Sequence, residues 1–365
     1  MTRRSFLGKA ATGAAAGAAL AAPAIVKAQA QPQIRWRLAS SFPKSLDTIY
    51  GAAAFFCERV GKLTEGKFEI TPYAAGQIVP ALQVLDAVQQ GTVECGHTAT
   101  YYYVGKNKAF AFGCAIPFGL TSRQQSAWVY AGGGMELVRE FCKEYGIIHF
   151  PGGNTGTQMG GWFKKEIKTV ADLKGLKMRI PGIGGEVMAR LGAVPQALPG
   201  TEIYAALERG VIDAAEWIGP YDDEKLGLHK VAKHYYYPAF WEPGTELAVM
   251  INIAAWDKLP RLYQEAVESA AAETHVKMQA QYDAKNPIAL KRLIADGVKL
   301  HPFPRDLLRA ANKAAFELYE AEAAKNPAFK KLYEPWKKFR EQQIEWFSIA
   351  ELSFESFVRE AADRR

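Results

Sequence analysis

Residues that could bind a small acid gather in the middle of this 365-residue chain. A basic residue, Arg179, stands near the carboxyl end of a predicted strand over 177–180. Another predicted strand ends at the acid–indole pair Glu216-Trp217, and a second acid, Glu242, follows among aromatic residues. Ligands of open α/β sheets bind outside the carboxyl ends of strands. We therefore expect these side chains to lie near one ligand site.

The arginine favours an anionic ligand. A planar guanidinium can donate two parallel hydrogen bonds to a carboxylate, which an ammonium group cannot. The alternative is a solvated strand arginine beside Lys174 and Lys177, and the residues alone leave both interpretations open.

Two other groups stand where a ligand would lie. The run Tyr101-Tyr102-Tyr103 follows a short predicted strand over 92–95. A polar loop over 153–158 leaves the apolar strand predicted over 147–150, and such a loop is a candidate hinge and ligand wall.

Motifs of common enzyme classes are absent from the sequence. It contains no G-x-S-x-G, no P-loop, no H-E-x-x-H and no well-placed G-x-G-x-x-G. The six histidines show no metal-ligand spacing, and the four cysteines form no C-x-x-C. Cys57 and Cys142 lie in apolar helical patterns, so we expect buried free thiols there, although an exported protein could form disulfides.

The first 30 residues have the order of an export signal. Arg3-Arg4 precedes an uncharged Ala/Gly-rich stretch over 10–26, and a small-x-small site follows at 28–30. The paired arginines are typical of the twin-arginine route. A membrane anchor is the alternative, but it needs about 20 strongly apolar residues. Removing this segment with its four basic residues lowers the formal charge from +7 to +3, which does not indicate a nucleic-acid surface.

Strand and helix patterns alternate along the rest of the chain. Strands are predicted over 34–38, 68–71 and 92–95, and helices over 48–63, with Asp47 as its cap, and 80–90. Alternation of this kind predicts α/β domains with largely parallel sheets.

One internal similarity suggests two related lobes. Residues 86–94 match residues 205–213 as a helix, a glycine and a strand, with Gly91 and Gly210 separated by 119 positions. The alternative is that helix–glycine–strand is simply a common unit.

The C-terminal sixth differs in composition. Residues 305–326 and 327–365 are predicted to be helical and are rich in charge. Large aromatics recur there at Tyr333, Trp336, Phe339, Trp346, Phe347, Phe354 and Phe357. An apolar stripe of that width must be buried, either across the two lobes or against a partner subunit.

Several long motifs resemble those of a known protein family. Residues 75–79 (AGQIV), 173–179 (LKGLKMR) and 206–213 (ALERGVID) resemble the periplasmic solute receptors of tripartite ATP-independent periplasmic (TRAP) transporters, of the DctP type. The resemblance covers essentially the whole chain. Residues 152–156 (GGNTG) and 216–225 (EWIGPYDDEK) look like the α-keto acid-binding subgroup.

The resemblance implies an α/β fold, a two-lobed periplasmic binding protein or clamshell with long C-terminal helices. After a signal peptide at 1–30, we expect lobe I to comprise 31–153 and 244–303. Lobe II is expected at 154–243 with the carboxylate and metal site, and 304–365 should form a helical segment for dimerisation through a swapped helix.

The resemblance also implies the site. Substrate-binding residues carried over from the family are Arg179, Gln158, Trp217, Asn154, Tyr103, Tyr102 and Tyr101. The implied metal ligands are Gln158, Glu216, Glu242 and the Trp217 carbonyl. An all-oxygen set suits a hard cation, with sodium expected and calcium as the alternative. Strand alternation would put Tyr101 and Tyr103 on one face, and we favour Tyr103 as the donor to the substrate carboxylate.

The implied function is that of a periplasmic receptor and not of an enzyme. It would bind a small 2-oxo acid such as pyruvate with a metal cation and deliver it to membrane permease subunits. A receptor for a 2-hydroxy acid such as lactate with calcium is one alternative. An exported lyase or hydrolase that uses Glu216 or Glu242 as a general base is the alternative from another class.

Overall fold

The structure is a computed structural model, and it describes residues 31–363. The predicted export signal at 1–30 lies outside the described residues. Residues Gln33–Arg365 form one compact unit, which contains both sheets of the protein.

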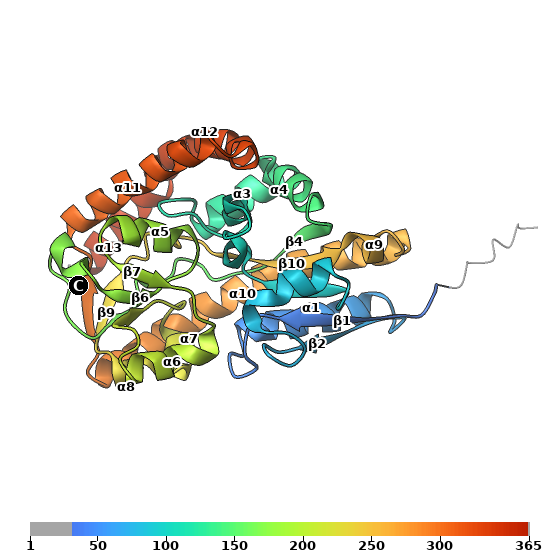
Figure 1. The fold of residues 1–365 in the computed structure, drawn as a ribbon, viewed down its shortest axis with the longest axis horizontal. Coiled ribbons are helices and arrows are strands. Elements are labelled where there is room, and N and C mark those ends of the chain that lie inside the picture. Colours follow the sequence, from blue (N-terminus) through green and yellow to red (C-terminus); the bar gives the residue numbers. More distant parts are fainter. Residues whose placement is uncertain (1–30, 364–365) are drawn as a thin grey trace, which may run out of the picture. The chain divides into compact units, whose positions relative to one another are not determined.

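The first sheet has five strands in the order β2-β1-β3-β10-β4 (Figure 1). Their bounds are β1 Ile34–Ser40, β2 Phe68–Tyr73, β3 Cys95–Thr98, β4 Ile147–Asn154 and β10 Glu246–Asn252. β1 pairs in parallel with β2 and β3, whereas β10 is antiparallel to β3 and β4. The strands predicted over 34–38, 68–71 and 147–150 are confirmed. The one predicted over 92–95 begins only at Cys95.

The second sheet has six strands in the order β11-β9-β5-β8-β6-β7. Their bounds are β5 Trp162–Phe163, β6 Lys177–Arg179, β7 Val194–Gln196, β8 Ala214–Ala215, β9 His234–Tyr237 and β11 Lys299–Pro302. β11 pairs with β9, so the prediction that residues 244–303 belong entirely to the first lobe is wrong for its last strand. The end of that segment returns to the second sheet because β9 offers it a parallel edge.

Two long helical segments lie on either side of this framework (Figure 1). Helix α10 (Arg261–Ala295) packs against α1 (Ile49–Leu63) and β4 and also reaches α7 (Pro220–Lys225). Helices α11 (Arg305–Ala323), α12 (Pro327–Ile349) and α13 (Glu351–Asp363) confirm the helical C-terminal segment. The other helices are α2 Val84–Gln89, α3 Ser122–Ala131, α4 Gly134–Lys143, α5 Gly182–Arg190, α6 Gly200–Glu208, α8 Leu228–Val231 and α9 Ile253–Trp256.

The predicted helix over 48–63 forms, but not with the predicted cap. The N-cap residue is Thr48, and no side chain caps this helix. The Asp47 carboxylate instead bonds to side chains of α7.

The two similar segments, 86–94 and 205–213, also have the same local structure. Gly91 and Gly210 both have positive φ, at 69° and 75°, which glycine adopts without steric cost. The amide of Thr92 donates to the Ala87 carbonyl at 2.9 Å, and the amide of Val211 donates to the Ala206 carbonyl at 3.0 Å. In both copies the glycine ends a helix and a strand begins four residues later.

The C-terminal aromatics divide into two groups. Tyr333 and Trp336 are buried and pack with Phe112 and Tyr319 inside the chain. Large apolar side chains at the other end are exposed, namely Ile344, Trp346, Ile349, Leu352, Phe354, Phe357 and Val358. The stripe is therefore buried by its own chain only along the first part of α12.

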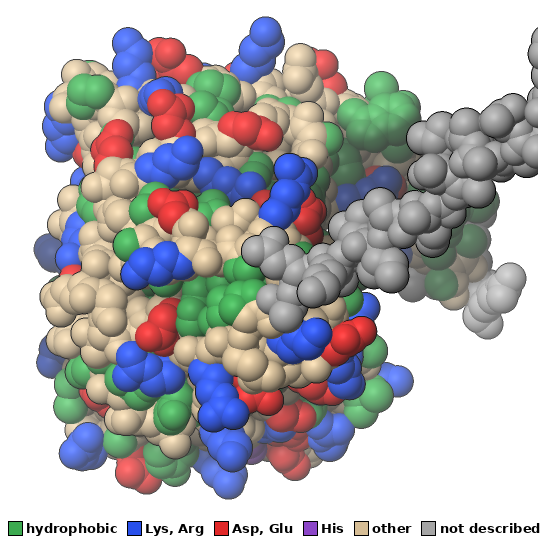
Figure 2. Space-filling model, turned by 90° about the vertical axis from the view of Figure 1, so that its right-hand side faces the viewer, with side chains coloured by type: hydrophobic (Ala, Val, Ile, Leu, Met, Phe, Trp, Pro, Cys, Tyr) green, Lys and Arg blue, Asp and Glu red, His purple; other side chains and the backbone are tan. Residues whose placement is uncertain are grey.

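The cysteines are buried and the surface charges are mixed. Cys57 and Cys142 are buried free thiols as predicted, and so are Cys95 and Cys114. Basic and acidic side chains are interspersed over the face in Figure 2. Among the helices of residues 31–363, none combines the length and apolar character that a bilayer crossing requires.

Candidate ligand and cation site

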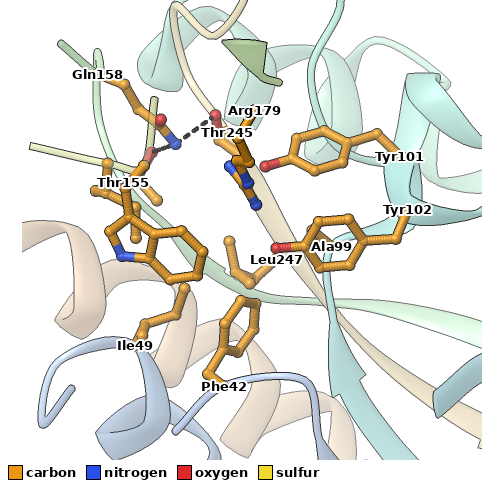
Figure 3. Close-up of a pocket in the computed structure, with 12 residues that line it drawn as sticks. Phe42, Ile49, Ala99, Tyr101, Tyr102, Thr155, Gln158, Arg179, Thr245 and Leu247 are labelled. Atoms are coloured by element: carbon orange, nitrogen blue, oxygen red, sulfur yellow. Dashed lines mark hydrogen bonds between the residues drawn. The ribbon is translucent and has the colours of Figure 1, made fainter. Parts of the chain in front are cut away.

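A pocket lies between segments that belong to the two sheets (Figure 3). Its empty volume is about 250 Å³. The lining residues are Phe42, Ile49, Ala99, Tyr101, Tyr102, Thr155, Gln158, Arg179, Trp217, Ile218, Thr245 and Leu247. A lining of this composition suits a small molecule with one polar end.

Arg179 is the only cation in the pocket lining, and it is 1% exposed. It stands at the end of β6, where its Nε donates to the Leu198 carbonyl at 3.0 Å. Its Nη1 donates to the Glu216 carbonyl at 3.0 Å and forms an ion pair with the Glu216 carboxylate. The Nη2 atom is buried and has no hydrogen-bond partner. One edge of the guanidinium is thus held in place while one donor is left for a ligand.

Two buried carboxyl groups lie beside this arginine. Glu216 and Glu242 are close enough for their charges to interact, and Glu242 Oε2 accepts bonds from Thr245 Oγ1 at 2.8 Å and Tyr101 Oη at 3.2 Å. Burial and the charge of Glu242 raise the pKa of Glu216 well above its ordinary value. Burial raises the pKa of Glu242 to about 7 in spite of its hydrogen bonds. Two such groups attract either a proton or a cation.

Gln158 presents a bare oxygen to the same site. Its Nε2 donates to Thr155 Oγ1 at 3.2 Å and to Thr245 Oγ1 at 3.0 Å, and these bonds fix the amide orientation. Its Oε1 is buried without a partner, as is Glu216 Oε2. Unpartnered buried acceptors are costly in a folded protein.

These donors fit a hard cation. Gln158 supplies an amide oxygen, Glu216 and Glu242 supply carboxylates, and no nitrogen or sulfur ligand is needed. The set contains only two acids, which agrees with the finding that no group of three or more His, Cys, Asp and Glu residues suited to a metal occurs among residues 31–363.

The loop that carries Glu216 and Trp217 is fixed by a buried aspartate. Asp223 Oδ1 accepts bonds from the amides of Ile218 at 3.2 Å and Gly219 at 3.1 Å. Its Oδ2 accepts bonds from Trp162 Nε1 at 2.9 Å and Tyr235 Oη at 2.7 Å. The loop therefore has a defined path from the end of β8 into α7.

The prediction for the tyrosine run is wrong in one respect. Residues Thr100–Tyr103 form a 3₁₀ helix rather than an extended strand, so successive side chains lie about 120° apart instead of alternating. Tyr101 and Tyr102 line the pocket, with their rings pointing toward Arg179 in Figure 3. Tyr103 does not, because its hydroxyl accepts from the Leu85 amide at 3.1 Å and bonds Thr98 Oγ1 at 2.9 Å in the core.

Asn154 is also placed outside the pocket lining. Its Oδ1 accepts from the Gly156 amide at 2.9 Å, and its Nδ2 donates to the Gly244 carbonyl at 3.4 Å. The side chain thus ties together the two segments that pass between the sheets.

Several pocket residues were not predicted. They are Phe42, Ile49, Ala99, Ile218, Thr245 and Leu247, whereas Thr155 lies in the loop over 153–158 that the sequence predicts as a ligand wall. Phe42 follows β1 just as Tyr101 follows β3, so its position after a strand was an available signal. Thr245 bonds both Gln158 and Glu242, and nothing in the local sequence indicates that role. Gly200 packs directly against the pocket, since a Cβ there would lie 2.4 Å from the Trp217 indole.

Comparisons with known proteins agree on one family. Residues 39–326 match the family model described as bacterial extracellular solute-binding protein, family 7. A monocarboxylate 2-oxoacid-binding periplasmic protein from Nostoc sp. (strain PCC 7120) is 56% identical over 327 residues, which cover 90% of each chain.

Solved structures give the same result. A TRAP transporter solute-binding protein from Bordetella bronchiseptica RB50 is 51% identical, with a TM-score of 0.90, over 91% of this chain and 99% of that one. That structure is a mixed-occupancy dimer with copurified calcium and picolinate in a bound active site, compared with an apo site. A TRAP periplasmic solute-binding protein from Pseudoalteromonas atlantica T6c, with bound sodium and pyruvate, is 41% identical with a TM-score of 0.86, over 89% and 99% of the chains.

Proposed function

This chain belongs to the bacterial extracellular solute-binding proteins of family 7, the solute receptors of TRAP transporters, and on that premise we propose that it binds a small 2-oxo monocarboxylate together with a hard metal cation. The carboxylate would bond Arg179. The cation would be held by Gln158, Glu216, Glu242 and the Trp217 carbonyl, and it would polarise and bind the keto oxygen.

One observation carries this proposal. Buried atoms without hydrogen-bond partners gather here. The donors Arg179 Nη2 and Trp217 Nε1 and the acceptor Gln158 Oε1 belong to residues that line the pocket, and the acceptor Glu216 Oε2 belongs to the carboxylate paired with Arg179. A donor suits a carboxylate, whereas two bare oxygens suit a cation. A carboxylate with an adjacent keto oxygen can satisfy both parts at once.

Charge balance supports the presence of the cation. With both glutamates ionised, Arg179, Glu216 and Glu242 sum to −1, and a bound carboxylate would bring the buried site to −2. Such a charge is strongly unfavourable at low dielectric. Calcium would bring the sum to zero, whereas sodium would leave −1 unless one glutamate kept its proton. The Bordetella and Pseudoalteromonas relatives contain calcium and sodium respectively, so both ions remain candidates.

The rest of the pocket favours a monocarboxylate. Phe42, Ile49 and Leu247 give it an apolar wall, and no second cation lines it to pair with a second carboxylate. The Nostoc relative is named for monocarboxylate 2-oxoacids, and the Pseudoalteromonas relative contains pyruvate. A 2-hydroxy acid such as lactate has the same head group and is the alternative ligand.

The family supports a proposal for the transport role and the assembly. We propose export to the periplasm by the twin-arginine route, closure of two lobes around the ligand, and delivery to membrane permease subunits. The exposed apolar residues of α12 and α13 support a homodimer formed through the C-terminal helices, and the Bordetella relative is a dimer. Family members are receptors, so we assign no catalytic step to Glu216 or Glu242.

Calorimetry with the metal-stripped mature chain tests the proposal. Pyruvate, 2-oxobutyrate, lactate and succinate are titrated in the presence of sodium, of calcium, or of chelator with potassium. We expect pyruvate or 2-oxobutyrate to bind in a cation-dependent manner and succinate not to bind. Cation-independent binding of succinate would refute the proposal.

Gln158→Ala separates the cation from the acid. The variant loses one oxygen ligand, so we expect its cation requirement to rise at least tenfold in concentration, a loss of the size seen when the support of a metal site is removed. Gln342→Ala, at an exposed position of α12, is the matched control and should leave binding unchanged.

A further inference from the structure

Asp47 joins the two walls of the pocket from outside it. It lies between β1 and α1, two residues before Ile49 and five after Phe42, both of which line the pocket. Its partners stand on α7, which begins directly after the loop of Glu216 and Trp217. Each side of this contact is therefore continuous with one wall of the site.

Three groups converge on the Asp47 carboxylate. Tyr221 Oη donates to Oδ2 at 3.0 Å, and the Lys225 ammonium donates to Oδ1. Lys285 Nζ, from α10, is 3.7 Å from Oδ2 and donates to Thr48 Oγ1 at 3.0 Å. The Asp47 carboxylate, in the segment after β1, is thus faced by two positive charges and one hydroxyl group.

Contacts other than the bond to Asp47 also hold Tyr221 in place. The ammonium groups of Lys225 and Lys285 lie 4.5 Å and 4.6 Å from the centroid of the Tyr221 ring, in cation–π geometry. The Tyr221 amide also donates to Asn286 Oδ1 at 3.0 Å, which fixes the first turn of α7 against α10.

Helix α7 is coupled to the binding loop. Asp223, on the same helix, accepts hydrogen bonds from the amides of Ile218 and Gly219. A displacement of α7 away from Asp47 would therefore move the segment that carries Glu216 and Trp217 away from Phe42 and Ile49.

We propose that Asp47, Tyr221 and Lys225 form a clasp that keeps the pocket closed over the bound acid and sets the rate at which the acid dissociates. This inference rests on the proposed function, because it requires a ligand to be released. The Asp47 side chain is 53% exposed, so the clasp is in contact with solvent, and salt should weaken it. Its expected effect on the dissociation rate is modest, about 1.4- to fivefold.

Stopped-flow tryptophan fluorescence tests the clasp. Dissociation of pyruvate is followed in the cation that supports wild-type binding, for wild type, Asp47→Ala, Lys225→Met and the double variant. We expect each single variant to dissociate about 1.4 to five times faster, with an association rate within twofold of wild type. The double variant should be no faster than the faster single variant, since both remove the same interaction. Raising the salt from about 0.05 M to 0.5 M should reduce the difference between wild type and Asp47→Ala.

Glu224→Gln is the matched control. Glu224 stands on α7 and forms an ion pair with Arg292 of α10, at 2.8 Å and 2.5 Å, without reaching the segment after β1. Pyruvate should dissociate from Glu224→Gln at the wild-type rate. As a second control, ligand-free Asp47→Ala should have the melting temperature of ligand-free wild type.

Two outcomes overturn the inference in distinguishable ways. If wild type binds pyruvate and Asp47→Ala dissociates at the wild-type rate, the clasp is wrong and the proposed function stands. If wild type binds no 2-oxo acid with any cation, the proposed function is wrong and the clasp falls with it.

Discussion

The guanidinium of Arg179 and the carboxylate of Glu216 form an ion pair inside the protein, and each keeps one atom without a partner. A buried pair of this kind contributes little net stability, because both charges lose their hydration. Its arrangement makes sense for binding: the pair fixes Nη1, while Arg179 Nη2 and Glu216 Oε2 stay available to a carboxylate and a cation.

Arg179→Lys should therefore abolish most of the binding while conserving the charge. An ammonium group cannot hold Leu198, Glu216 and a ligand carboxylate in one plane. We expect a loss of about 2–5 kcal/mol in binding free energy, measured by calorimetry with pyruvate. Arg35→Lys, at an exposed position in β1, is the control, and near-wild-type affinity of Arg179→Lys would remove this residue from the site.

Cation binding should strengthen as pH rises through about 7. The pKa of Glu242 is raised to about 7 and that of Glu216 lies well above its ordinary value, so below this range protons compete with the cation. We expect calcium affinity to rise between about pH 5.5 and 8, with proton release detected by calorimetry in buffers of different ionisation enthalpy. Glu242→Gln should flatten this dependence, and an equally steep slope in that variant would contradict the assignment.

Removing the hydroxyl of Tyr102 should affect ligand affinity, whereas removing that of Tyr103 should affect stability. Tyr102→Phe removes a hydroxyl from the pocket lining, so we expect weaker pyruvate binding with unchanged stability. Tyr103→Phe removes a hydroxyl that bonds Leu85 and Thr98, so we expect a loss of about 1 kcal/mol in unfolding free energy with unchanged affinity. Calorimetry and urea denaturation separate the two, and weaker binding in Tyr103→Phe alone would restore Tyr103 as the donor to the substrate.

Gly200→Ala should displace the Trp217 indole. A Cβ at Gly200 would lie 2.4 Å from the ring, and its surroundings are too close-packed for a simple shift. We expect at least tenfold weaker pyruvate binding and a lower melting temperature. Gly51→Ala in α1 is the control: a Cβ there meets nothing within 4 Å, so stability should hold or rise.

Much of the framework can be predicted from short-range patterns. The strands that begin at Ile34, Phe68 and Ile147 are visible as apolar alternation, and the C-terminal helices as long charged and aromatic runs. The repeated glycines, Gly91 and Gly210, locate two helix ends correctly because a positive φ is a local requirement.

Wrong predictions arise where a short pattern fits two local conformations or where distant segments decide the outcome. An extended strand would direct Tyr103 toward the ligand, but the chain turns into a 3₁₀ helix after Ala99. Asp47 has the sequence position of a helix cap, whereas its partners come from a helix 174 to 178 positions away. β11 pairs with β9, and no local pattern reveals which sheet edge will accept it.

Site residues within family motifs can be predicted, whereas those that depend on long-range contacts cannot. The structure brings Arg179, Gln158, Glu216 and Glu242 together, although they come from four separate segments. The family motifs indicate these residues, whereas the supporting hydroxyl of Thr245 depends on a crossing between the sheets that only the fold reveals.

The four thiols have a practical consequence. Each is buried, none is bridged to another, and burial raises the pKa of the Cys57, Cys95, Cys114 and Cys142 thiols, so they resist attack by oxidants. The native state needs no oxidative cross-linking, and reducing agents should leave its melting curve unchanged. The chain can therefore mature in a glutathione-rich cytosol, and an engineered surface cysteine would be the one reactive handle for attaching a fluorophore.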